Sequence, residues 1–415
     1  MDRVPARQHW GMGGLRELVV ARGRACGLDA VGIASASPFE RTLGDLLSRK
    51  EAGHSADMQF TYRNPQRSTD PSMTLSGARS LVVGAVRYAS ESAGADSAVD
   101  ARGIDPDVAH GPGDGSDADR PRPSGRVARY AIGPHDEVLR SALGALAEDL
   151  RLAGYRAVVL ADDNALVDRA AAHRAGLGWF GRSANFLLPG RGSWFVLGSV
   201  LTDAELQPAP EVVPDGCGTC RRCIDACPTG AIVDDGVVDA RRCLSWLLQS
   251  PGTFPHEHRV ALGDRIYGCD DCQEVCPPNR LADRRGEGVA VALDGSSGSG
   301  VDAGRVDLLQ MLDADDGSLL EMAGRWYVPD RDPQHLRRNV LLVLGNTADG
   351  TDPEVASRLR RYLCGDDPDL ASHAAWAALR LGRRDLLEDE GVAGRSWIRD
   401  EMERWDRSIV MSSAG

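Results

Sequence analysis

Apolar residues recur along the first half of the chain at two alternating spacings, one typical of helices and one typical of buried strands. The helical spacing predicts helices over Gly14–Leu28, Pro38–Glu51, His135–Ala153 and Leu166–Ala175. Short apolar runs predict strands over Asp29–Ser35, Ser80–Tyr88 and Tyr155–Asp162, and two further short strands around a turn at Gly190–Gly192. We therefore expect a domain of α/β or α+β class, with a ligand crevice at the carboxyl ends of its strands.

The last third of the chain has a different pattern, in which the sequence of a pair of helices is repeated. Asp352-Pro353 and Asp367-Pro368 each place an Asp cap and a Pro at the start of a helix. The helical segments His335–Asn346 and Ser372–Gly382 resemble each other, and the glycines near their ends lie 37 residues apart. This period predicts HEAT-like helical repeats. Because two repeats cannot bury a core alone, we expect them to pack on the rest of the chain.

Charge and targeting signals narrow the possible partners. The chain has 415 residues and a net charge of -13, but eight Asp or Glu residues against two Arg lie in the stretch 91–120 alone. We expect this Gly-, Ser- and Ala-rich stretch to be a disordered acidic insertion. Without it, the charge does not exclude an RNA partner. No apolar segment approaches the ~20 residues of a membrane span, and the N-terminus lacks the apolar run of a secretory signal, so we expect a cytoplasmic protein.

Eight of the ten cysteines lie close together in the middle of the chain. The first set has the C-x2-C-x2-C-x3-C-P spacing that holds an iron–sulfur cluster, and the second set repeats it in altered form. In two-cluster ferredoxins, the fourth ligand of each cluster comes from the other set. We therefore predict two [4Fe–4S] clusters, one held by Cys217, Cys220, Cys223 and Cys276, and the other held by Cys269, Cys272, Cys243 and Cys227.

Two other uses of these cysteines fit the sequence less well. Paired C-x2-C motifs also chelate zinc, but zinc sites rarely use eight cysteines within about sixty residues. A disulfide framework does not suit a chain that is expected in a reducing compartment. The remaining cysteines, Cys26 and Cys364, lie in helical patterns, and we expect them to be buried thiols without a role.

The segment that precedes the cysteines carries a second group of motifs. Asp162 ends a predicted strand and opens a run to Asp168-Arg169, after which come a glycine-rich turn and Gly192-Ser193-Trp194. A strand-end Asp is commonly a helix N-cap, and a glycine-rich stretch is commonly a plain turn. Next to the cysteine sets, however, these motifs resemble those of the epoxyqueuosine reductases, iron–sulfur and cobalamin enzymes of tRNA modification. The chain departs from the family pattern at Asn164-Ala165, where the family has Gly-Pro, and at Arg182, where it has Lys.

The resemblance implies a fold and a set of site residues. The family has an α/β domain with a nitroreductase-like core, a two-cluster ferredoxin-like module and a helical repeat module, which divides this chain into 1–205, 206–285 and 286–400 with a tail at 401–415. It implies that Asp162 faces the cobalt of a bound cobalamin and donates a proton to the substrate. The other implied cobalamin contacts are Arg67, Asn185, Phe186, Leu187, Leu188, Ser245, Asp270 and Asp271. We further expect burial beside the cofactor to raise the pKa of Asp162.

The activity implied by the resemblance is reduction of epoxyqueuosine to queuosine at the wobble position of tRNA anticodons. An external low-potential donor would send electrons through the clusters to cobalt, and Asp162 would protonate the oxygen that leaves the opened epoxide. The family places its tRNA-stem contacts on the C-terminal helices, and we expect a monomer. The arginines there are Arg337, Arg338, Arg358, Arg360 and Arg361, for which a solvated helix face is the default. Two alternatives stay open, a corrinoid reductive dehalogenase and a non-catalytic iron–sulfur electron-transfer module.

Overall fold

The structure is a computed structural model that describes residues 12–88, 122–209, 211–285, 301–302, 304–389 and 391–413. The predicted acidic insertion at 91–120 lies outside the described residues. The chain forms two compact units, each composed of three segments. The first unit consists of Met1–Ala89, Ala128–Leu247 and Gly268–Leu293, and the second unit consists of Ser90–Val127, Leu248–Tyr267 and Asp294–Gly415. These units run across the predicted divisions after residues 205 and 285, which stay a prediction.

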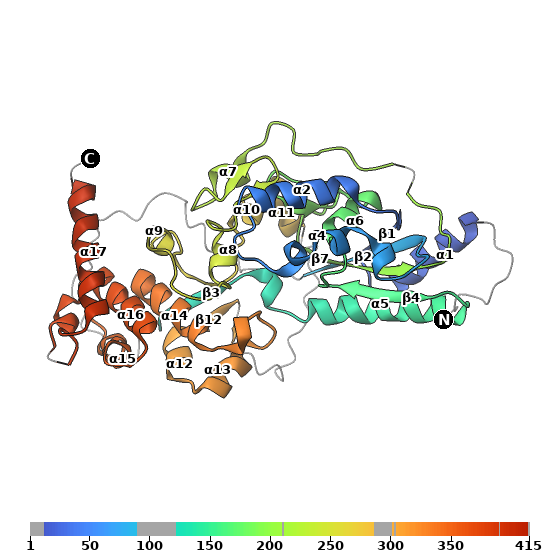
Figure 1. Cartoon of the computed structure of the whole chain (residues 1–415). Helices are drawn as coiled ribbons and strands as arrows, with labels where there is room; N and C mark the ends of the chain where they lie inside the picture. Colours follow the sequence, from blue (N-terminus) through green and yellow to red (C-terminus); the bar gives the residue numbers. More distant parts are fainter. Residues whose placement is uncertain are drawn as a thin grey trace. The chain divides into compact units, whose positions relative to one another are not determined.

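The first unit is built on a four-stranded sheet with the order β1-β2-β7-β4 (Figure 1). Its strands are β1 (Ala30–Ser35), β2 (Ser80–Arg87), β7 (Phe195–Thr202) and β4 (Ala157–Ala161). Every neighbouring pair is antiparallel. The expected crevice at a common row of carboxyl ends is therefore wrong, because antiparallel neighbours end at opposite edges. Instead, the ends of β2 and β4 share one edge with the starts of β1 and β7.

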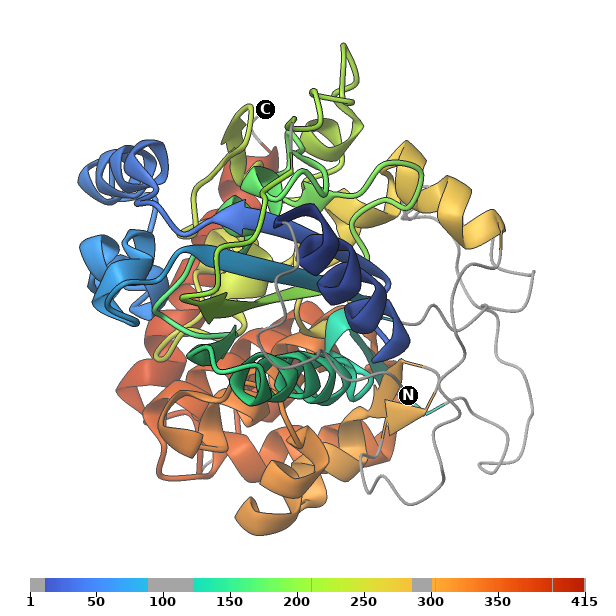
Figure 2. The ribbon, with the colours of Figure 1, turned by 90° about the vertical axis from the view of Figure 1, so that its right-hand side faces the viewer.

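Helices cover both faces of this sheet, as Figures 1 and 2 show. On one face, α1 (Met12–Ala25) packs beside α5 (His135–Leu152), whose leucines at helical spacing enter the core as the sequence predicts. On the other face, α6 (Asp168–Arg174) packs its alanines against the alternate residues of the same strands. The predicted helix α2 (Glu40–Glu51) is also present. The prediction of a mixed α and β domain is confirmed.

The stretch between α2 and β2 contains short helices where none was predicted. They are α3 (Phe60–Arg63), α4 (Pro65–Thr69) and η1 (Pro71–Met73). The Asn64 side chain accepts a hydrogen bond from the Arg67 N–H at 3.1 Å, and the Asp70 carboxylate accepts one from the Ser72 N–H at 3.0 Å. Helices this short have no apolar periodicity, so the Asn-Pro and Asp-Pro caps were the only local signal.

The cysteine stretch and the segment before it add only short elements to the first unit. They are β5 (Trp179–Phe180), β6 (Phe186–Leu187), α7 (Arg222–Asp225), β8 (Ile232–Asp234), β9 (Val237–Val238), α8 (Leu244–Leu247), α10 (Asp271–Glu274) and α11 (Pro277–Arg284). A further short helix, η3 (Arg129–Ala131), precedes α5. β5 and β6 form an antiparallel hairpin, and so do β8 and β9. Closely spaced cysteines and turns leave little room for longer elements.

The second unit combines a small sheet with a set of helices. Its sheet has the order β10-β3-β12-β11, from β10 (Arg265–Tyr267), β3 (Ser124–Val127), β12 (Arg305–Asp307) and β11 (Val301–Asp302). Its helices are α9 (His256–Arg259), α12 (Leu308–Asp313), α13 (Asp316–Ala323), η4 (Pro329–Arg331), α14 (Gln334–Thr347), α15 (Pro353–Leu363), α16 (Pro368–Arg380), η5 (Arg384–Leu387) and α17 (Ser396–Ser413).

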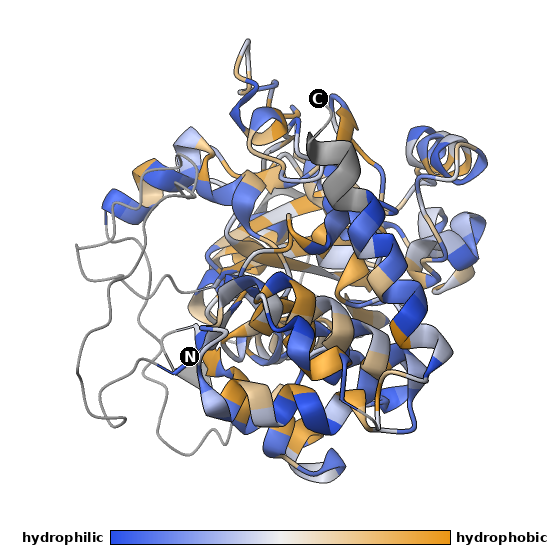
Figure 3. Ribbon diagram, turned by 90° about the vertical axis from the view of Figure 1, so that its left-hand side faces the viewer, coloured by the Kyte–Doolittle hydropathy of each residue, from blue (hydrophilic) through white to orange (hydrophobic). Residues whose placement is uncertain are grey.

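The C-terminal helices pack around α14 and α16. Ten consecutive residues of α14, from Leu336 to Gly345, are buried, so this helix is surrounded by protein. A Cβ added at Gly345 would lie 2.8 Å from the Ala377 Cα, which shows how closely α14 approaches α16. The neighbouring helices show apolar and polar residues side by side (Figure 3), as expected when one face is buried. The predicted caps are confirmed, because Asp352 and Asp367 accept hydrogen bonds from the first turns of α15 and α16.

Among the residues that the structure describes, no helix combines the length and the apolar character that crossing a membrane requires.

Candidate functional site

Three segments of the first unit come together at one edge of its sheet. Because β7 pairs antiparallel with β2 and with β4, Tyr88 after β2 and Asp162 after β4 lie at the edge where Ser193 and Trp194 lead into β7. The Tyr88 N–H donates to the Trp194 carbonyl at 3.2 Å, and their ring centroids are 5.7 Å apart. The fold therefore brings the Asp162 motif and the Gly-Ser-Trp motif to the same edge.

Asp162 has an unusual backbone conformation for a residue with a side chain. Its φ is 51°, in the left-handed region that few residues other than Gly, Asn and Asp adopt. It is not the N-cap of the next helix, because α6 begins at Asp168 and its N-cap is Val167. The turn is instead supported by Asp163, whose Oδ1 accepts a hydrogen bond from the Ala165 N–H at 2.8 Å. A left-handed residue kept at a strand end points to a functional role for its side chain.

The Asp162 side chain is exposed, and among the described residues no hydrogen bond to its carboxylate is found. The burial that we expected around Asp162 is therefore not provided by the chain itself.

All eight predicted cluster ligands are free thiols, and they fall into two groups. In the first group, Cys276 lies near Cys217, Cys220 and Cys223. Burial, followed by the charges of these three neighbours, raises the pKa of Cys276 to about 11, against a hydrogen bond from the Asn279 backbone that lowers it. Burial and then Cys217 likewise raise the pKa of Cys223. Four sulfurs from two separate parts of the sequence thus share one neighbourhood.

The second group contains the other four cysteines. Burial, followed by the charges of Cys269 and Cys243, raises the pKa of Cys272 well above its ordinary value. Burial raises the pKa of Cys243 as well, and Cys227 adds to the effect. The Cys227 Sγ accepts a hydrogen bond from the Ala231 N–H at 3.1 Å. The two groups have the membership that the predicted crossed pairing requires, while the ligand sets themselves stay a prediction.

The zinc alternative requires ligands that converge on a single ion. Within the described part of the chain, no three or more His, Cys, Asp or Glu side chains are placed to hold one metal ion. Two groups of four thiols match the number of sulfur ligands that two [4Fe–4S] clusters need. The buried, mutually repelling thiols would ionise readily once such a cation replaced their protons.

A buried hydrogen-bond network fixes the helices of the second cysteine set to the sheet edge. The Gln273 Nε2 donates to the Tyr88 hydroxyl at 3.1 Å and to the Ser193 Oγ at 2.9 Å. The Asn279 Nδ2 donates to the Ser193 Oγ at 2.9 Å, and its Oδ1 accepts from the Ser193 N–H at 2.6 Å. A Cβ at Gly192 would lie 1.9 Å from that Oδ1, so the position requires Gly. Sequence reasoning missed Gln273 and Asn279, although both stand within three residues of a cluster cysteine.

Several predicted cofactor contacts lie in or beside the cysteine groups. The Asn185 Nδ2 is 3.5 Å from the Cys272 Sγ. The side chains of Phe186–Leu188 are buried, which leaves the backbone of this hairpin as their contact surface. Asp270 is also buried, and its Oδ2 accepts a hydrogen bond from the Arg129 N–H at 2.7 Å. Asp271 is half-buried at the start of α10.

The remaining predicted contacts lie on other elements. Ser245 is half-buried in α8, directly after Cys243 and Leu244. Arg67 is exposed on α4. The next residue, Ser68, donates from its hydroxyl to the Asn164 carbonyl at 2.6 Å, so α4 packs against the turn that follows Asp162. Arg67 is therefore adjacent to a residue that contacts the Asp162 turn, although Arg67 and Asp162 lie far apart in sequence.

The sheet edge has unsatisfied polar groups that a polar cofactor would fit. Among the described residues, the Trp194 indole Nε1 is buried without a hydrogen-bond partner. The Arg129 guanidinium lies 4.4 Å from the centre of that ring. Together with the exposed Asp162 carboxylate, the edge offers an unused donor and an unused acceptor. A corrinoid, whose rim carries amide groups, would fit both.

The arginines of the C-terminal helices do not form free positive clusters. Arg337 and Arg338 are buried, contrary to the expected solvated face. The Arg338 Nη1 donates to the Ser250 carbonyl at 2.8 Å, and the Arg337 Nη1 lies 2.7 Å from the Asp316 Oδ1. Arg358 and Arg361 both pair with Asp313, at 2.8 and 3.0 Å, and Arg360 pairs with Asp389 at 2.9 Å. These charges are largely neutralised inside the second unit.

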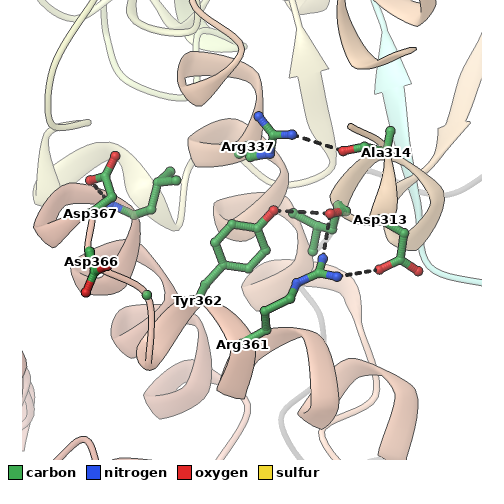
Figure 4. A pocket seen from close by; sticks show the side chains of 10 residues that line it. Asp313, Ala314, Arg337, Arg361, Tyr362, Asp366 and Asp367 are labelled. Atoms are coloured by element: carbon green, nitrogen blue, oxygen red, sulfur yellow. Dashed lines mark hydrogen bonds and ion pairs between the residues drawn. The ribbon is translucent and has the colours of Figure 1, made fainter. Parts of the chain in front are cut away.

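Figure 4 shows the pocket that some of these residues line, with a volume of about 390 Å³. The Tyr362 hydroxyl donates to the Leu312 carbonyl at 3.2 Å, and the Arg361 guanidinium bridges that carbonyl and the Asp313 carboxylate. The side chains that line the pocket are therefore mostly engaged with one another.

The two cysteines outside the clusters are less buried than expected. Cys26 is half-buried and packs against the core beside α1 and α5. Cys364 is exposed at the C-cap of α15, so its prediction as a buried thiol is wrong. The apolar residues of α15 end at Leu363, one position earlier.

A match to a known family model identifies the class of protein. Residues 216–279 match the model of a 4Fe–4S double cluster binding domain. This stretch contains all eight predicted cluster cysteines. With a mixed α and β unit around it, the chain is a double-cluster iron–sulfur protein.

Individual relatives narrow this class. The chain is 33% identical over 272 residues to the epoxyqueuosine reductase of Bacillus anthracis, covering 65% of this chain and 66% of the relative, just under two thirds of its length. It is 32% identical to that of Vibrio cholerae over 85% of this chain and 88% of the relative. It is 30% identical to that of Lactococcus garvieae over 91% and 99%. The chain therefore belongs to the epoxyqueuosine reductases, a family of oxidoreductases.

Solved structures agree with this assignment. A crystal structure of epoxyqueuosine reductase with an epoxyqueuosine-modified tRNA stem loop has a TM-score of 0.75 at 26% identity, covering 95% of this chain and 98% of the other. The enzyme from Bacillus subtilis, with its catalytic aspartate loop swung out of the active site, has a TM-score of 0.76 at 25% identity, covering 95% and 99%.

Proposed function

We propose that this protein reduces epoxyqueuosine to queuosine at the wobble position of tRNA anticodons. The observation that carries the proposal is the set of chemical groups that the first unit brings together. It contains both groups of cysteines and the Asp162 turn, joined through the buried contacts of Ser193 with Gln273 and Asn279. Electron carriers and a carboxyl group on an unusual turn thus belong to one compact body, as a reductive active site requires.

The two cysteine groups are the electron carriers. Cys217, Cys220, Cys223 and Cys276 hold one [4Fe–4S] cluster, and Cys269, Cys272, Cys243 and Cys227 hold the other. Each cluster moves one electron at a time, whereas removing the epoxide oxygen takes two electrons and two protons and releases water. An external low-potential donor supplies the electrons.

Asp162 is the group that gives a proton to the oxygen of the opening epoxide. Its support is its place at the sheet edge, its left-handed backbone and its carboxylate without a partner among the described residues. The relative from Bacillus subtilis, in which a catalytic aspartate loop swings out of the active site, supports a mobile acid of this kind. Cofactor and substrate would cover the Asp162 carboxyl and exclude water from it.

Cobalamin is the proposed third cofactor. Arg67, Asp162, Ser245, the backbone of 185–188 and Asp270-Asp271 would hold it at the sheet edge. When bound, it would supply a low-valent, strongly nucleophilic cobalt. The protein residues bind and orient the cofactor, exclude water from it and hold the proton at the Asp162 carboxyl.

The tRNA-binding part is proposed to be the helical module of 286–400, with HEAT-like repeats. The support is the relative whose structure holds an epoxyqueuosine-modified tRNA stem loop, together with the repeated Asp-Pro caps at α15 and α16. Since Arg337 and Arg338 are buried in this unit, phosphate contacts would fall to exposed cations such as Arg360 and Arg380. Binding should weaken with salt.

The test is to delete the gene and measure tRNA nucleosides by mass spectrometry. We expect epoxyqueuosine to accumulate and queuosine to disappear, and the intact gene to restore queuosine. The purified protein, reconstituted anaerobically, should carry about eight irons from two [4Fe–4S] clusters. With cobalamin, it should convert an epoxyqueuosine-containing anticodon stem loop.

The same experiment decides between the alternatives. Unchanged nucleosides together with reductive release of halide from a halogenated substrate would assign the chain to the dehalogenases. Unchanged nucleosides with two clusters and no uptake of cobalamin would indicate a pure electron carrier.

A further inference from the structure

Asp168 is a carboxyl group of the first unit that the proposed function has not yet used. It is the first residue of α6 and lies six positions after Asp162. Among the described residues, its Oδ1 is buried without any hydrogen-bond partner. Buried carboxylate oxygens normally have partners, so this orphan atom needs an explanation. The residue as a whole is half-buried, but a carboxylate oxygen that is itself buried without a donor favours uptake of a proton.

The surroundings of Asp168 favour its protonated form. Burial raises its pKa well above the ordinary 3.8, and the charge of Asp162 is the next largest cause, followed more weakly by Asp163. Arg169 on the same helix and Arg140 on α5 act in the opposite direction. The start of α6 also favours a negative charge, but only weakly for a helix of seven residues.

Among the described residues, neither arginine donates a hydrogen bond to the Asp168 carboxyl. The Arg169 Nη1 donates to the Ala184 carbonyl at 2.9 Å, which directs its guanidinium toward the β5–β6 hairpin. Arg140 lies on α5, and its charge lowers the Asp168 pKa less than Asp162 raises it. The strongest charged neighbour of Asp168 is thus another acid, the proposed proton donor itself.

The proposed reaction needs a second proton at a time when the site is covered. Reduction of the epoxide consumes two protons, and Asp162 can hold only one. Its carboxylate is exposed in the free protein and can be reprotonated from water there. Under bound cofactor and tRNA, that path closes, so a second internal acid is required.

We propose that Asp168 is the proton reservoir of this site, a positioning residue that acts through Asp162. This inference rests on the proposed function. After Asp162 gives its proton to the epoxide oxygen, the O–H bond of Asp168 breaks and its proton passes to the Asp162 carboxylate. Asp162 then supplies the proton with which the oxygen leaves as water. The two electrons come through the clusters from the external donor, and Asp168 is reprotonated from water when the product leaves.

The first test uses the cofactor-free protein and does not depend on activity. Infrared spectra at neutral pH should show the carbonyl stretch of a protonated carboxyl that is lost in Asp168→Asn. In Asp162→Asn, the pH at which this band disappears should fall, because the neighbouring negative charge is removed. In Asp163→Asn, it should fall less. A wild-type protein without the band would overturn the proposal, since Asp168 would then be ionised.

The second test measures turnover of the reconstituted enzyme on an epoxyqueuosine stem loop. We expect Asp168→Asn to lose about 10²-fold in steady-state rate, the low end of general acid–base contributions. Asp168→Glu should retain most of the rate, and the residual activity of Asp168→Asn should show a larger solvent deuterium isotope effect than the wild type, because proton supply has become limiting. A purely structural role would leave the isotope effect unchanged, and an Asp168→Asn rate equal to the wild type would also refute the reservoir.

Thermal unfolding of each variant shows whether it is folded, and Asp168→Glu keeps the test decisive if Asp168→Asn is not. Failure of the proposed function is distinguishable, because it would leave the wild-type enzyme itself inactive while the infrared band of Asp168 stayed in place.

Discussion

The buried charge network of the second unit and the sheet edge of the first unit treat their charged groups in opposite ways. In the second unit, Arg259 and Glu401 are fully buried and lie 3.3 Å apart. Around them, the His373 Nε2 accepts a hydrogen bond from the Phe254 N–H at 3.2 Å, and Ser372 donates to Glu401 at 3.2 Å. At the sheet edge of the first unit, the Asp162 carboxylate and the Asp168 Oδ1 have no hydrogen-bond partner among the described residues.

This difference separates structural charges from chemical ones. A buried charge that is fully paired holds segments together, and here it ties the segment between two cluster cysteines to α16 and α17. A buried carboxylate oxygen without a partner, such as the Asp168 Oδ1, lowers stability, and proteins keep such groups mainly at functional sites. Substitutions should therefore affect activity at the sheet edge of the first unit and stability in the buried network of the second.

The largest expected effect is loss of activity in Asp162→Asn. Asn tolerates the left-handed backbone at this position, and the side chain is exposed, so the fold should not change. Removing the proton donor should lower the rate of epoxyqueuosine reduction by about 10²- to 10⁴-fold, the usual contribution of general acid catalysis. The rate is measured by mass spectrometry of nucleosides, and stability by thermal unfolding.

Asp163→Asn is the matched control for this variant. Its side chain belongs to the same turn, and an amide oxygen can still accept the hydrogen bond from the Ala165 N–H. Near wild-type activity is expected. Equal rates in the wild type and Asp162→Asn would remove Asp162 from the proposed chemistry and with it the contrast between the two units.

Most of the fold of the first unit could be predicted from local patterns. α5 and β2 have strong apolar periodicity, and each lies close to its predicted range. In the second unit, the predicted Asp-Pro caps mark the starts of α15 and α16. The antiparallel order of the sheet could not be predicted, because pairing depends on contacts between segments far apart in sequence. For the same reason, the sequence did not indicate that Leu248–Tyr267 would join the second unit.

The part of the candidate site that depends on the spacing of residues in the sequence could be predicted. The eight cysteines repeat at intervals that few proteins use by chance. Gln273 and Asn279 carry no such signal, because a buried amide becomes a bridge only when the fold brings Ser193 to it. The prediction for the arginines on α14 was wrong for a different reason. Charged residues on a helix usually face solvent, and the sequence does not show that they will be buried against a partner such as Asn339.

The next largest effect is on stability in the second unit. Arg259→Met would leave the Glu401 carboxylate buried without its cation, and breaking such a pair costs about 3–5 kcal/mol. Hydrogen exchange of the α16 and α17 amides should report this loss as easier local opening. The double variant Arg259→Met/Glu401→Leu removes both charges and should recover much of it.

Arg407→Met is the exposed counterpart of that variant. Arg407 pairs with Glu403 on the same helix at 3.6 Å, and both side chains are about two thirds exposed. Exchange in α17 should remain nearly unchanged. If hydrogen exchange in α17 changed equally in the Arg259 and Arg407 variants, the buried network would not stabilise the second unit more than an exposed pair does.

A moderate effect is expected from pH through His373. Burial, followed by the charge of Arg259, lowers the pKa of His373 well below its ordinary 6.5. The Nε2 accepts from the Phe254 N–H, so the folded state requires the neutral ring. The unfolded chain binds a proton below pH 6.5 and the folded chain does not, so stability is complete above that pH and falls as the pH decreases. The loss should reach about 1.4 kcal/mol per pH unit for one proton.

His373→Gln tests this dependence, because an amide oxygen can accept from Phe254 but does not titrate. Between pH 7 and pH 5, local opening of α16 should become easier in the wild type and change much less in the variant. An identical pH response of the two proteins would assign the effect to other groups.

The smallest expected effect is that of the exposed pair between Arg360 and Asp389. Their side chains are 48% and 44% exposed, and the guanidinium Nε lies 2.9 Å from the carboxylate. Pairs of this kind contribute about 0–1 kcal/mol, so Arg360→Ala should barely change unfolding. Its affinity for an anticodon stem loop is the informative measurement. If Arg360 contacts phosphate, the variant binds more weakly with a salt dependence reduced by about one charge. Unchanged affinity and salt dependence would mean that this arginine, like its buried neighbours on α14, serves only the second unit's own packing.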